Sequence, residues 1–312
     1  MTEVSTSPAS ASGAAPTGAG TSHRPVLAML EFAADGGATL GHRIVEAGAP
    51  QIEVMDLSAT RGDGIFETIS TRSGKLQALE PHLRRFAHSA ALLELPPPDL
   101  DEWRDAVIDV AARLGPADEG FVKIVLTRGV EGQDDPTGWA YAAASPDHSP
   151  ARTNGIRIVL LDRGYRHDIA QTSPWLLAGA KTLSYAINRA AFREAARRDA
   201  DDALFVSSDG YLLEGAISNL VMRTGKRLVT PRTDLGILEG TTQADLFRFA
   251  EAAGYETAYE LLTPEDLLAA DAAWLVSSVR HAAPVREIDG KPFPVDREMS
   301  DAMNDFLRGR TE

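Results

Sequence analysis

The amino-acid sequence predicts an α+β fold in two parts. Short strand patterns alternate with amphipathic helix patterns along residues 23–312, which is typical of sheets with helices between them. A stretch rich in Pro, Asp, Ser and Asn at residues 146–154 indicates a linker. We therefore expect a smaller N-terminal domain over residues 23–145 and a larger C-terminal domain over residues 155–312.

The first 22 residues differ in composition from the rest of the chain. They are mostly Ser, Thr, Ala, Gly and Pro, and they lack the basic start and apolar stretch of a signal peptide. Such a segment buries too little apolar surface to offset the entropy that it loses on ordering. We expect residues 1–22 to be a disordered tail outside the fold.

Charge and residue usage exclude several classes of function. The chain has 312 residues, a net charge of -14 and no cysteine. An acidic protein is a poor electrostatic match for nucleic acid or for an anionic membrane surface. No apolar run approaches the roughly 20 residues that span a bilayer, and without cysteine there is no disulfide and no thiolate metal site. We expect a cytoplasmic protein that acts on a small molecule, with no nucleic-acid, membrane or metal partner.

Periodicity places the elements of the N-terminal part. Apolar residues repeat with a helical period over residues 81–95, and three prolines then end the helix. A second amphipathic helix over residues 99–114 begins with Asp99 as its N-cap. A turn at residues 73–75 closes a hairpin. Strands are expected over residues 26–31, 52–55, 65–71, 121–127 and 139–144.

The C-terminal part contains more strands, separated by turns that contain glycine. Turns at residues 208–210, 224–226 and 289–291 indicate hairpins. Helices are expected over residues 184–198 and 241–253. Strands are expected over residues 156–161, 203–206, 211–213, 219–223, 227–229 and 273–277.

Lysine is scarce, with five copies among 31 basic residues. Lys75, Lys226 and Lys291 lie in hairpin turns, and Lys123 is expected on the exposed face of a strand. Lys181 instead follows an apolar run and precedes a helix. A lysine in this setting can be partly desolvated, which lowers its pKa and makes its amine nucleophilic. The alternative is a lysine that extends from the edge of the core into water.

Other common catalytic motifs are absent from the sequence. It contains no G-x-x-x-x-G-K-[ST] loop, no H-E-x-x-H and no G-x-S-x-G. His82 and His88 are the only closely spaced histidines, and their separation does not place them on one helix face.

Five short motifs occur in order around Lys181. They are Arg61-Gly-Asp-Gly-Ile-Phe-Glu-Thr68, His82-Leu-Arg-Arg-Phe86, Ala180-Lys-Thr-Leu-Ser-Tyr185, Glu214-Gly-Ala-Ile-Ser-Asn219 and Leu238-Glu-Gly-Thr-Thr242. Together they resemble the class-IV aminotransferases, a family of pyridoxal 5'-phosphate enzymes, from about residue 52 to about residue 290. The resemblance implies fold-type IV, which is similar to D-amino acid aminotransferase and has a smaller N-terminal and a larger C-terminal domain.

The resemblance implies roles for three residues of these motifs. Lys181 is the catalytic lysine that holds pyridoxal 5'-phosphate and then moves the proton next to the substrate nitrogen. Glu214 is the carboxylate that pairs with the pyridine nitrogen. Arg85 binds the phosphate, to which its fork is suited. Arg84 is the alternative, because only one of the two can face the site from a helix.

The resemblance also implies four more residues at the cofactor. Thr241 and Thr242 start a helix and are expected to bind the phosphate with their N–H groups and hydroxyls, an ordinary N-cap being the alternative. Tyr185 is expected to contact the ring hydroxyl. Asn219, which ends the Glu214 motif, is expected beside the cofactor.

The substrate is implied to lie between a strand and a loop. Phe66 and Glu67 occupy a strand that is expected to line the substrate pocket. Ser278 and Val279 match a loop whose N–H groups often receive a substrate carboxylate in this family, and a purely structural role is the alternative.

The motifs leave the reaction open between two candidates. The Y-x-R signature of branched-chain enzymes and the R-x-H carboxylate trap of D-amino acid enzymes are absent. The forms at residues 61–68, 123–129 and 181–185 are most similar to aminodeoxychorismate lyases of actinobacteria, although the loop at residues 131–136 departs from that pattern and leaves the substrate-carboxylate contacts in doubt. We expect a lyase that converts 4-amino-4-deoxychorismate to 4-aminobenzoate and pyruvate for folate synthesis. The alternative is an aminotransferase acting on branched-chain or D-amino acids with a 2-oxo acid acceptor.

The resemblance further implies a homodimer with its two sites near the subunit interface. A binding protein that has kept the fold and lost the chemistry is a third hypothesis. The joint presence of Lys181, Glu214 and Arg85 argues against it.

Overall fold

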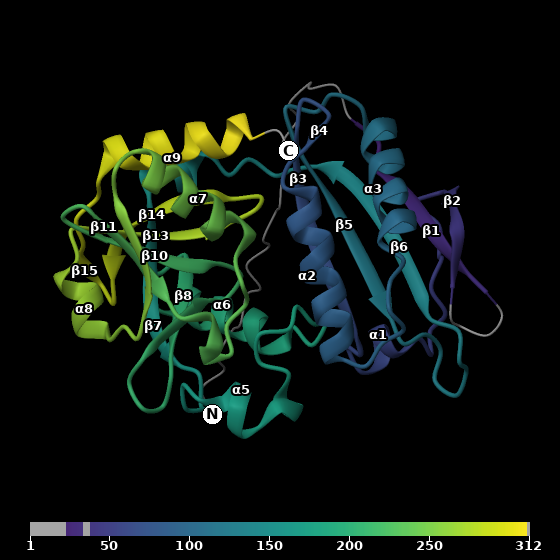
Figure 1. The fold of residues 1–312 in the computed structure, drawn as a ribbon, viewed down its shortest axis with the longest axis horizontal. Helices are drawn as coiled ribbons and strands as arrows, with labels where there is room; N and C mark the ends of the chain where they lie inside the picture. The colour runs from purple at the N-terminus through teal and green to yellow at the C-terminus, as the bar shows by residue number, and fades with distance from the viewer. Residues whose placement is uncertain (1–22, 34–37, 311–312) are drawn as a thin grey trace, which may run out of the picture.

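The computed structural model describes residues 23–33 and 38–310, which form two sheets, each covered by its own helices (Figure 1). The N-terminal sheet has six strands and the C-terminal sheet nine, so the predicted α+β fold with a smaller N-terminal and a larger C-terminal part is confirmed. The tail expected over residues 1–22 lies outside the described residues. The expected linker contains a short helix, α4 (Ser149–Asn154), and the domain limits themselves remain a prediction.

The N-terminal sheet is antiparallel, with the strand order β2-β1-β6-β5-β3-β4. Helices α2 and α3 pack on one face, where the rings of Phe86 and Trp103 meet edge to face with their centroids 4.8 Å apart. The strands are β1 (Val26–Phe32), β2 (Thr39–Val45), β3 (Gly64–Arg72), β4 (Lys75–Leu76), β5 (Glu119–Thr127) and β6 (Thr137–Ala144). The helices are α1 (Leu57–Thr60), α2 (Leu79–Leu92) and α3 (Leu100–Leu114), and Asp99 caps α3 as expected.

One expected strand is wrong. Residues 52–55 form a bend and a turn. The strand that pairs with β1 is β2, which lies earlier in the chain. The turn brings Asp56 to the start of α1, where its carboxylate accepts from the Ser58 N–H at 2.8 Å and from the Thr127 hydroxyl at 3.1 Å. The apolar side chain of Val54 is 83% exposed. A β-branched residue favours a strand only where it can pack against a neighbouring strand, and Val54 has no such neighbour.

The C-terminal sheet is mixed, with the order β12-β11-β10-β13-β14-β7-β8-β9 and β15 paired to β14. Its parallel pairs are β11 with β12, β14 with β7 and β7 with β8. The strands are β7 (Ile156–Asp162), β8 (Asp202–Val206), β9 (Leu212–Gly215), β10 (Asn219–Thr224), β11 (Arg227–Pro231), β12 (Glu256–Glu260), β13 (Ala272–Ser277), β14 (His281–Ile288) and β15 (Lys291–Pro292). The helices are α5 (Ile169–Thr172), α6 (Ala186–Arg197), α7 (Thr241–Ala252), α8 (Pro264–Ala269) and α9 (Arg297–Gly309), with 3-10 turns η1 (Pro174–Leu176) and η2 (Thr233–Leu235).

Separate apolar clusters fix the helices to this sheet. Helices α7 and α9 share one cluster, in which Phe247 and Met303 pack with Trp274 of β13. Helix α6 packs through Ala191 and Ala195 on a different part of the sheet. No helix among the described residues combines the length and the apolar character needed to cross a membrane.

The two halves meet along α2 and β3 (Figure 1). The segment that carries Lys181 lies along β3, because the Phe66 N–H donates to the Lys181 carbonyl at 3.0 Å and the Leu183 N–H donates to the Gly64 carbonyl at 2.8 Å. Gln77, just before α2, donates to the Leu307 carbonyl of α9 at 3.0 Å. The residues singled out in the sequence are therefore brought together at this junction.

Candidate active site

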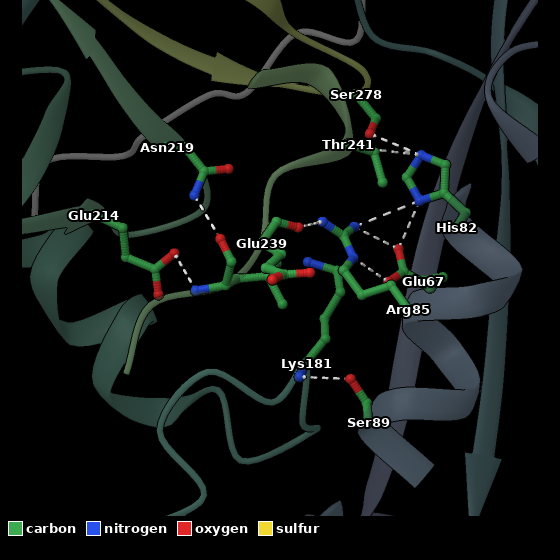
Figure 2. A network of polar contacts seen from close by, with 11 residues as sticks. Glu67, His82, Arg85, Ser89, Lys181, Glu214, Asn219, Glu239, Thr241 and Ser278 are labelled. Atoms are coloured by element: carbon green, nitrogen blue, oxygen red, sulfur yellow. Dashed lines mark hydrogen bonds and ion pairs between the residues drawn. The ribbon is translucent and has the colours of Figure 1, made fainter. Parts of the chain in front are cut away.

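A cavity of about 350 Å³ lies between the two halves, and nine of the eleven residues expected at the site line it. Glu67 and Glu214 do not. Glu214 lies directly behind the wall: its carboxylate accepts from the N–H of Leu238, which itself lines the cavity. Figure 2 shows six of the expected side chains converging from both halves: Arg85, Lys181, Glu214, Asn219, Thr241 and Ser278. The nine lining residues are Phe66, Arg85, Lys181, Tyr185, Asn219, Thr241, Thr242, Ser278 and Val279.

Lys181 presents an amine that burial makes easy to deprotonate. Its Nζ lies 4.5 Å from the centre of the Phe66 ring. Burial lowers the pKa of Lys181 to about 8, and the negative charges of Glu67 and Glu214 limit the fall. Its backbone is fixed, because the Lys181 N–H donates to the Ser89 hydroxyl of α2 at 3.1 Å. A larger share of the amine than for an exposed lysine is therefore neutral and nucleophilic near neutral pH.

Glu214 lies at the end of β9 with its carboxylate in an apolar setting. Burial raises the pKa of Glu214 to about 7, although the Leu238 N–H and the charge of Lys181 favour its ionised form. The Leu238 N–H, at 3.1 Å, is the one hydrogen-bond donor to this carboxylate among the residues that the structure describes. A ligand that brings a cationic N–H to Glu214 would meet an acceptor that lacks partners.

Arg85, and not Arg84, faces the cavity from α2. Its Nε and Nη2 bind both oxygens of Glu67 at 2.6 and 2.8 Å, and its Nη1 donates to the Glu239 carbonyl at 2.5 Å. The fork that we expected for a phosphate is therefore occupied by Glu67, and one N–H of Nη1 by the Glu239 carbonyl, which leaves the second N–H of Nη1 for a ligand. Arg84 is exposed to solvent on the same helix.

Glu67 was expected to line the cavity, and it does not: it is buried on the far side of β3. Neighbouring residues of a strand point to opposite faces, so Phe66 and Thr68 line the cavity while Glu67 faces α2. There it accepts from His82 Nδ1 at 2.7 Å. The positive charge of Arg85, with the hydrogen bonds from Arg85 and His82, holds the pKa of Glu67 well below its usual range against the opposing effect of burial.

The N-terminus of α7 forms one end of the cavity. Gly240 caps the helix with no side-chain hydrogen bond, so the first N–H groups of the helix are left without a side-chain partner. The Thr242 hydroxyl is buried and has no hydrogen-bond partner within residues 23–33 and 38–310. The Asn219 amide donates to the Leu238 carbonyl at 2.7 Å and closes this end from the side. Such an arrangement suits an anion.

Aromatic rings form one wall. Phe66 and Tyr185 pack edge to face with their centroids 5.4 Å apart. The Tyr185 hydroxyl lies 3.5 Å from the Ala216 carbonyl, and burial raises the pKa of this phenol, with the charge of Glu214 adding to the effect. The phenol therefore stays protonated and can donate a hydrogen bond.

Lys123 corrects a prediction. We expected its side chain on an exposed face, and it lines the same cavity as Lys181, with its Nζ 5.5 Å from the centre of the Phe66 ring. Burial lowers the pKa of Lys123. Within the part of the chain that the structure describes, no carboxylate pairs with it. Lys123 lies opposite Thr68 in the β3–β5 pair, and Thr68 shares a face with Phe66, so the strand pairing, which the sequence does not show, places Lys123 at the cavity.

The family of the chain follows from comparison with known proteins. Residues 64–288 match the model of the class IV amino-transferases. The chain belongs to this family.

Class IV relatives span nearly the whole chain. A bifunctional aminodeoxychorismate lyase / D-amino acid transaminase from Mycobacterium tuberculosis is 44% identical over 268 residues, which are 82% of this chain and 92% of that protein. The solved fold IV-transaminase CpuTA1 from Curtobacterium pusillum is 51% identical, with a TM-score of 0.89 over 92% of this chain and all of the other. A hypothetical aminotransferase from Mycobacterium tuberculosis, solved in a PLP-bound form, is 41% identical, with a TM-score of 0.82 over 85% of this chain and 96% of that one. The expected fold-type IV architecture is confirmed.

Proposed function

We propose that this class IV protein is a pyridoxal-phosphate-dependent lyase that converts 4-amino-4-deoxychorismate to 4-aminobenzoate and pyruvate. The family depends on pyridoxal 5'-phosphate, and the chain is an enzyme of this class. The observation that carries the proposal is the pairing of a readily deprotonated Lys181 on the cavity wall with Glu214, whose pKa burial raises to about 7, directly behind that wall. An amine and a carboxylate in these states suit chemistry on an amino compound.

The residues present fit the cofactor at both of its ends. Glu214 is short of donors and would accept from the protonated ring nitrogen. The buried Thr242 hydroxyl and the N–H groups at the start of α7 would bind the phosphate, with the Arg85 Nη1 edge nearby. Thr241 joins this end, and Phe66 and Tyr185, packed edge to face, would form the wall beside the ring.

Each residue then has a defined task in the reaction. When bound, the cofactor supplies an acceptor for the electron pair that is released as a C–H bond next to its nitrogen breaks. Lys181 Nζ takes the proton from the substrate carbon that bears the nitrogen, because its pKa near 8 lets it both accept and return a proton at neutral pH. The enolpyruvyl C–O bond breaks, the substrate ring becomes aromatic, and a proton added to the enolpyruvyl carbon completes pyruvate.

Lys123 supplies the cation that this substrate needs. 4-Amino-4-deoxychorismate carries carboxylates, and Lys123 is a partly buried amine on the cavity wall. A carboxylate there would form a charge-assisted hydrogen bond that water cannot readily replace. Ser278 and Val279 line the cavity, and their N–H groups would offer a second place for a substrate carboxylate.

The second candidate is a D-amino acid or branched-chain aminotransferase. It is favoured by the 51% identity to a fold IV-transaminase and by the second activity named for the mycobacterial relative. The lyase is preferred here because the same relative also carries that activity and because the two aminotransferase carboxylate signatures are absent from the sequence. A transaminase would use the same cavity for two substrates in turn.

We also propose that the enzyme works as a homodimer in the cytoplasm. Trp175 and Ile187 expose 73% and 59% of their surface near the segment that carries Lys181. Large apolar side chains at this exposure are typical of a surface that a partner covers. Light scattering of the purified protein at several concentrations tests this point, and a monomer at all of them would contradict it.

The test of the reaction uses the enzyme loaded with pyridoxal 5'-phosphate and 4-amino-4-deoxychorismate, with no oxo acid present. We expect 4-aminobenzoate and pyruvate to appear in equal amounts. The products should vanish in Lys181→Ala and persist in Lys291→Ala, whose lysine is exposed in a hairpin. No product, together with turnover of D-alanine and 2-oxoglutarate, would overturn the lyase and establish the transaminase.

A further inference from the structure

Two lysines reach the cavity from opposite edges of β3. Strand β5, which carries Lys123, pairs along one edge, with Lys123 opposite Thr68 (Figure 1). The segment that carries Lys181 follows the other edge, where the Phe66 N–H donates to the Lys181 carbonyl. Both amines approach the Phe66 ring, whose centre lies 4.5 Å from Lys181 Nζ and 5.5 Å from Lys123 Nζ. One small substrate molecule can therefore contact both.

The two lysines are the groups of the cavity wall best suited to exchange protons. The other ionisable side chains among the described residues that line the cavity are Arg85 and Tyr185. A guanidinium holds its proton too tightly to act as an acid, and burial raises the pKa of Tyr185 above its ordinary value. Burial has the opposite effect on Lys123, whose pKa it lowers, so this amine gives up a proton more readily than an exposed lysine.

The proposed reaction needs two proton transfers at different atoms of the substrate. Lys181 removes a proton from the ring carbon that bears the nitrogen. The departing enolpyruvyl group must gain a proton on its methylene carbon, which lies several bonds away at the end of a side group. One amine could serve both atoms only by moving across the substrate. Two amines from opposite edges of β3 meet both without such a movement.

We propose that Lys123 is a second catalytic residue, the acid that protonates the departing enolpyruvyl group. The inference rests on the proposed lyase function. The bond between the ring and the ether oxygen breaks, and a carbonyl forms at that oxygen. The electron pair of the enolpyruvyl double bond takes a proton from Lys123 Nζ and becomes the third C–H bond of the pyruvate methyl group. The pair freed when Lys181 takes the ring proton completes the aromatic ring, and the neutral Lys123 regains a proton from water.

The same contact can hold the enolpyruvyl group and protonate it. An ammonium group has three N–H donors, so one can bind the enolpyruvyl carboxylate while another points at the neighbouring methylene carbon. An arginine offers the same positive charge and does not release a proton in proteins. Lys123→Arg is therefore the variant that keeps the binding and removes the proton transfer.

The experiment follows the handedness of the methyl group in pyruvate. The loaded enzyme receives 4-amino-4-deoxychorismate whose methylene carries one deuterium and one tritium in a fixed geometry, and the pyruvate is reduced to lactate as it forms. We expect a single methyl configuration from the wild type, because a fixed amine protonates one face. Lys123→Arg should give both configurations equally, because water then supplies the proton, and its kcat should fall about a hundredfold. Lys226→Arg, at an exposed turn, should behave like the wild type.

A second measurement separates binding from proton transfer. The lactyl ether analogue of the substrate has its methylene already reduced, so it binds without reacting. Calorimetry with cofactor-free protein should give the same Kd for Lys123→Arg as for the wild type. Lys123→Met should raise that Kd by about tenfold, because the charge that meets the carboxylate is lost.

The outcomes distinguish this inference from the proposed function. A wild-type enzyme that forms neither 4-aminobenzoate nor pyruvate would refute the proposed function itself. Equal amounts of both products, with a racemic methyl group, would overturn the role of Lys123 alone. A single configuration retained in Lys123→Arg would also overturn it and assign the second proton transfer to another group. A loss of analogue binding in Lys123→Arg as large as its loss of kcat would reduce Lys123 to a binding residue.

Discussion

Three ionisable side chains in or beside the cavity are held in surroundings that disfavour their charge. Burial lowers the pKa of Lys181 to about 8, lowers that of Lys123 and raises that of Glu214 to about 7. The charged form of each group is stabilised when a ligand brings the complementary charge or a hydrogen bond. When no ligand is bound, the same groups lower the free energy of unfolding, as is common at sites selected for function rather than for stability.

Glu214 shows most directly how a site residue can favour ligand binding and lower the stability of the unliganded protein. We expect Glu214→Gln to stabilise the cofactor-free protein at about pH 8 and less at about pH 5. The folded-state pKa, about 7, lies above the ordinary value of 4.5, so the folded protein binds the proton more tightly and stability falls as pH rises between these values. The gain at high pH is at most about 3 kcal/mol. Thermal unfolding at the two pH values measures it.

The same variant should lose activity by about a hundredfold, because the ring nitrogen loses its anionic partner. Glu239→Gln, which alters an exposed carboxylate nearby, should leave both stability and turnover near the wild-type values. Equal stabilisation of Glu214→Gln at both pH values would contradict the raised pKa.

Lys123 offers a cation to a substrate carboxylate on the cavity wall. We expect Lys123→Met to raise the KM for 4-amino-4-deoxychorismate by roughly tenfold to a hundredfold, because a charge-assisted hydrogen bond to a carboxylate is lost. The cofactor absorbance should not change. Since burial lowers the pKa of Lys123, the wild-type KM should also begin to rise at a lower pH than an exposed lysine would allow.

Steady-state kinetics of Lys123→Met and of Lys226→Met, an exposed turn lysine, provide the comparison. A variant that binds cofactor poorly but keeps its KM would place Lys123 at the cofactor and refute its role in binding substrate.

Sequence reasoning found some of these residues and missed others for a physical reason. Lys181 and Glu214 stand out because their motifs lie in a recognisable order and spacing. The direction of Lys123 depends on which face of β5 the other half of the molecule covers, and the sequence does not state that. The contacts of His82 reach partners up to 196 residues away.

At the scale of elements, the start of α7 depends on a glycine. A Cβ on Gly240 would lie 2.8 Å from Asn219 Cγ and 2.9 Å from Gln243 Cβ, both closer than such atoms approach in proteins. Asn219 is held by its hydrogen bond to the Leu238 carbonyl, so it cannot move away without opening this end of the cavity.

We expect Gly240→Ala to weaken binding of pyridoxal 5'-phosphate by about tenfold and to destabilise the protein by about 1–3 kcal/mol. Gly309→Ala is the matched control, because a Cβ there meets nothing within 4 Å. Cofactor titration and chemical denaturation of both variants test this, and equal behaviour of the two would show that the close approach at Gly240 has no effect.

Long periodic patterns predicted elements well, and isolated apolar runs did not. The helices expected over residues 81–95, 99–114 and 241–253 correspond to α2, α3 and α7, because their apolar stripes are the faces that pack on the sheets. The strand expected over residues 52–55 is absent, while β2 and β12 at two sheet edges were missed. Pairing partners decide whether a short apolar segment becomes a strand, and sequence periodicity does not show them.

At the scale of the whole molecule, the end of α9 ties the two halves together. Gln77, 1% exposed, donates to the carbonyls of Leu307 and Arg308 at 3.0 and 3.2 Å. Arg310 pairs with Asp245 of α7 at 2.5 Å, with both side chains nearly buried. The last turn of α9 and Arg310 thus connect the N-terminal half to α7, the helix whose first turn closes the cavity.

This connection predicts a large effect far from the cavity. Asp245→Ala would leave the Arg310 guanidinium, 7% exposed, without its carboxylate, which costs about 3 kcal/mol or more and lowers the Tm by roughly 6–12 °C. Adding Arg310→Met should recover much of the loss, because the unpaired charge is removed. Asp305→Ala, which removes a 72% exposed partner of Arg308, should shift the Tm little. If Asp245→Ala and Asp305→Ala melt alike, the junction of the two halves does not depend on the Arg310 pair.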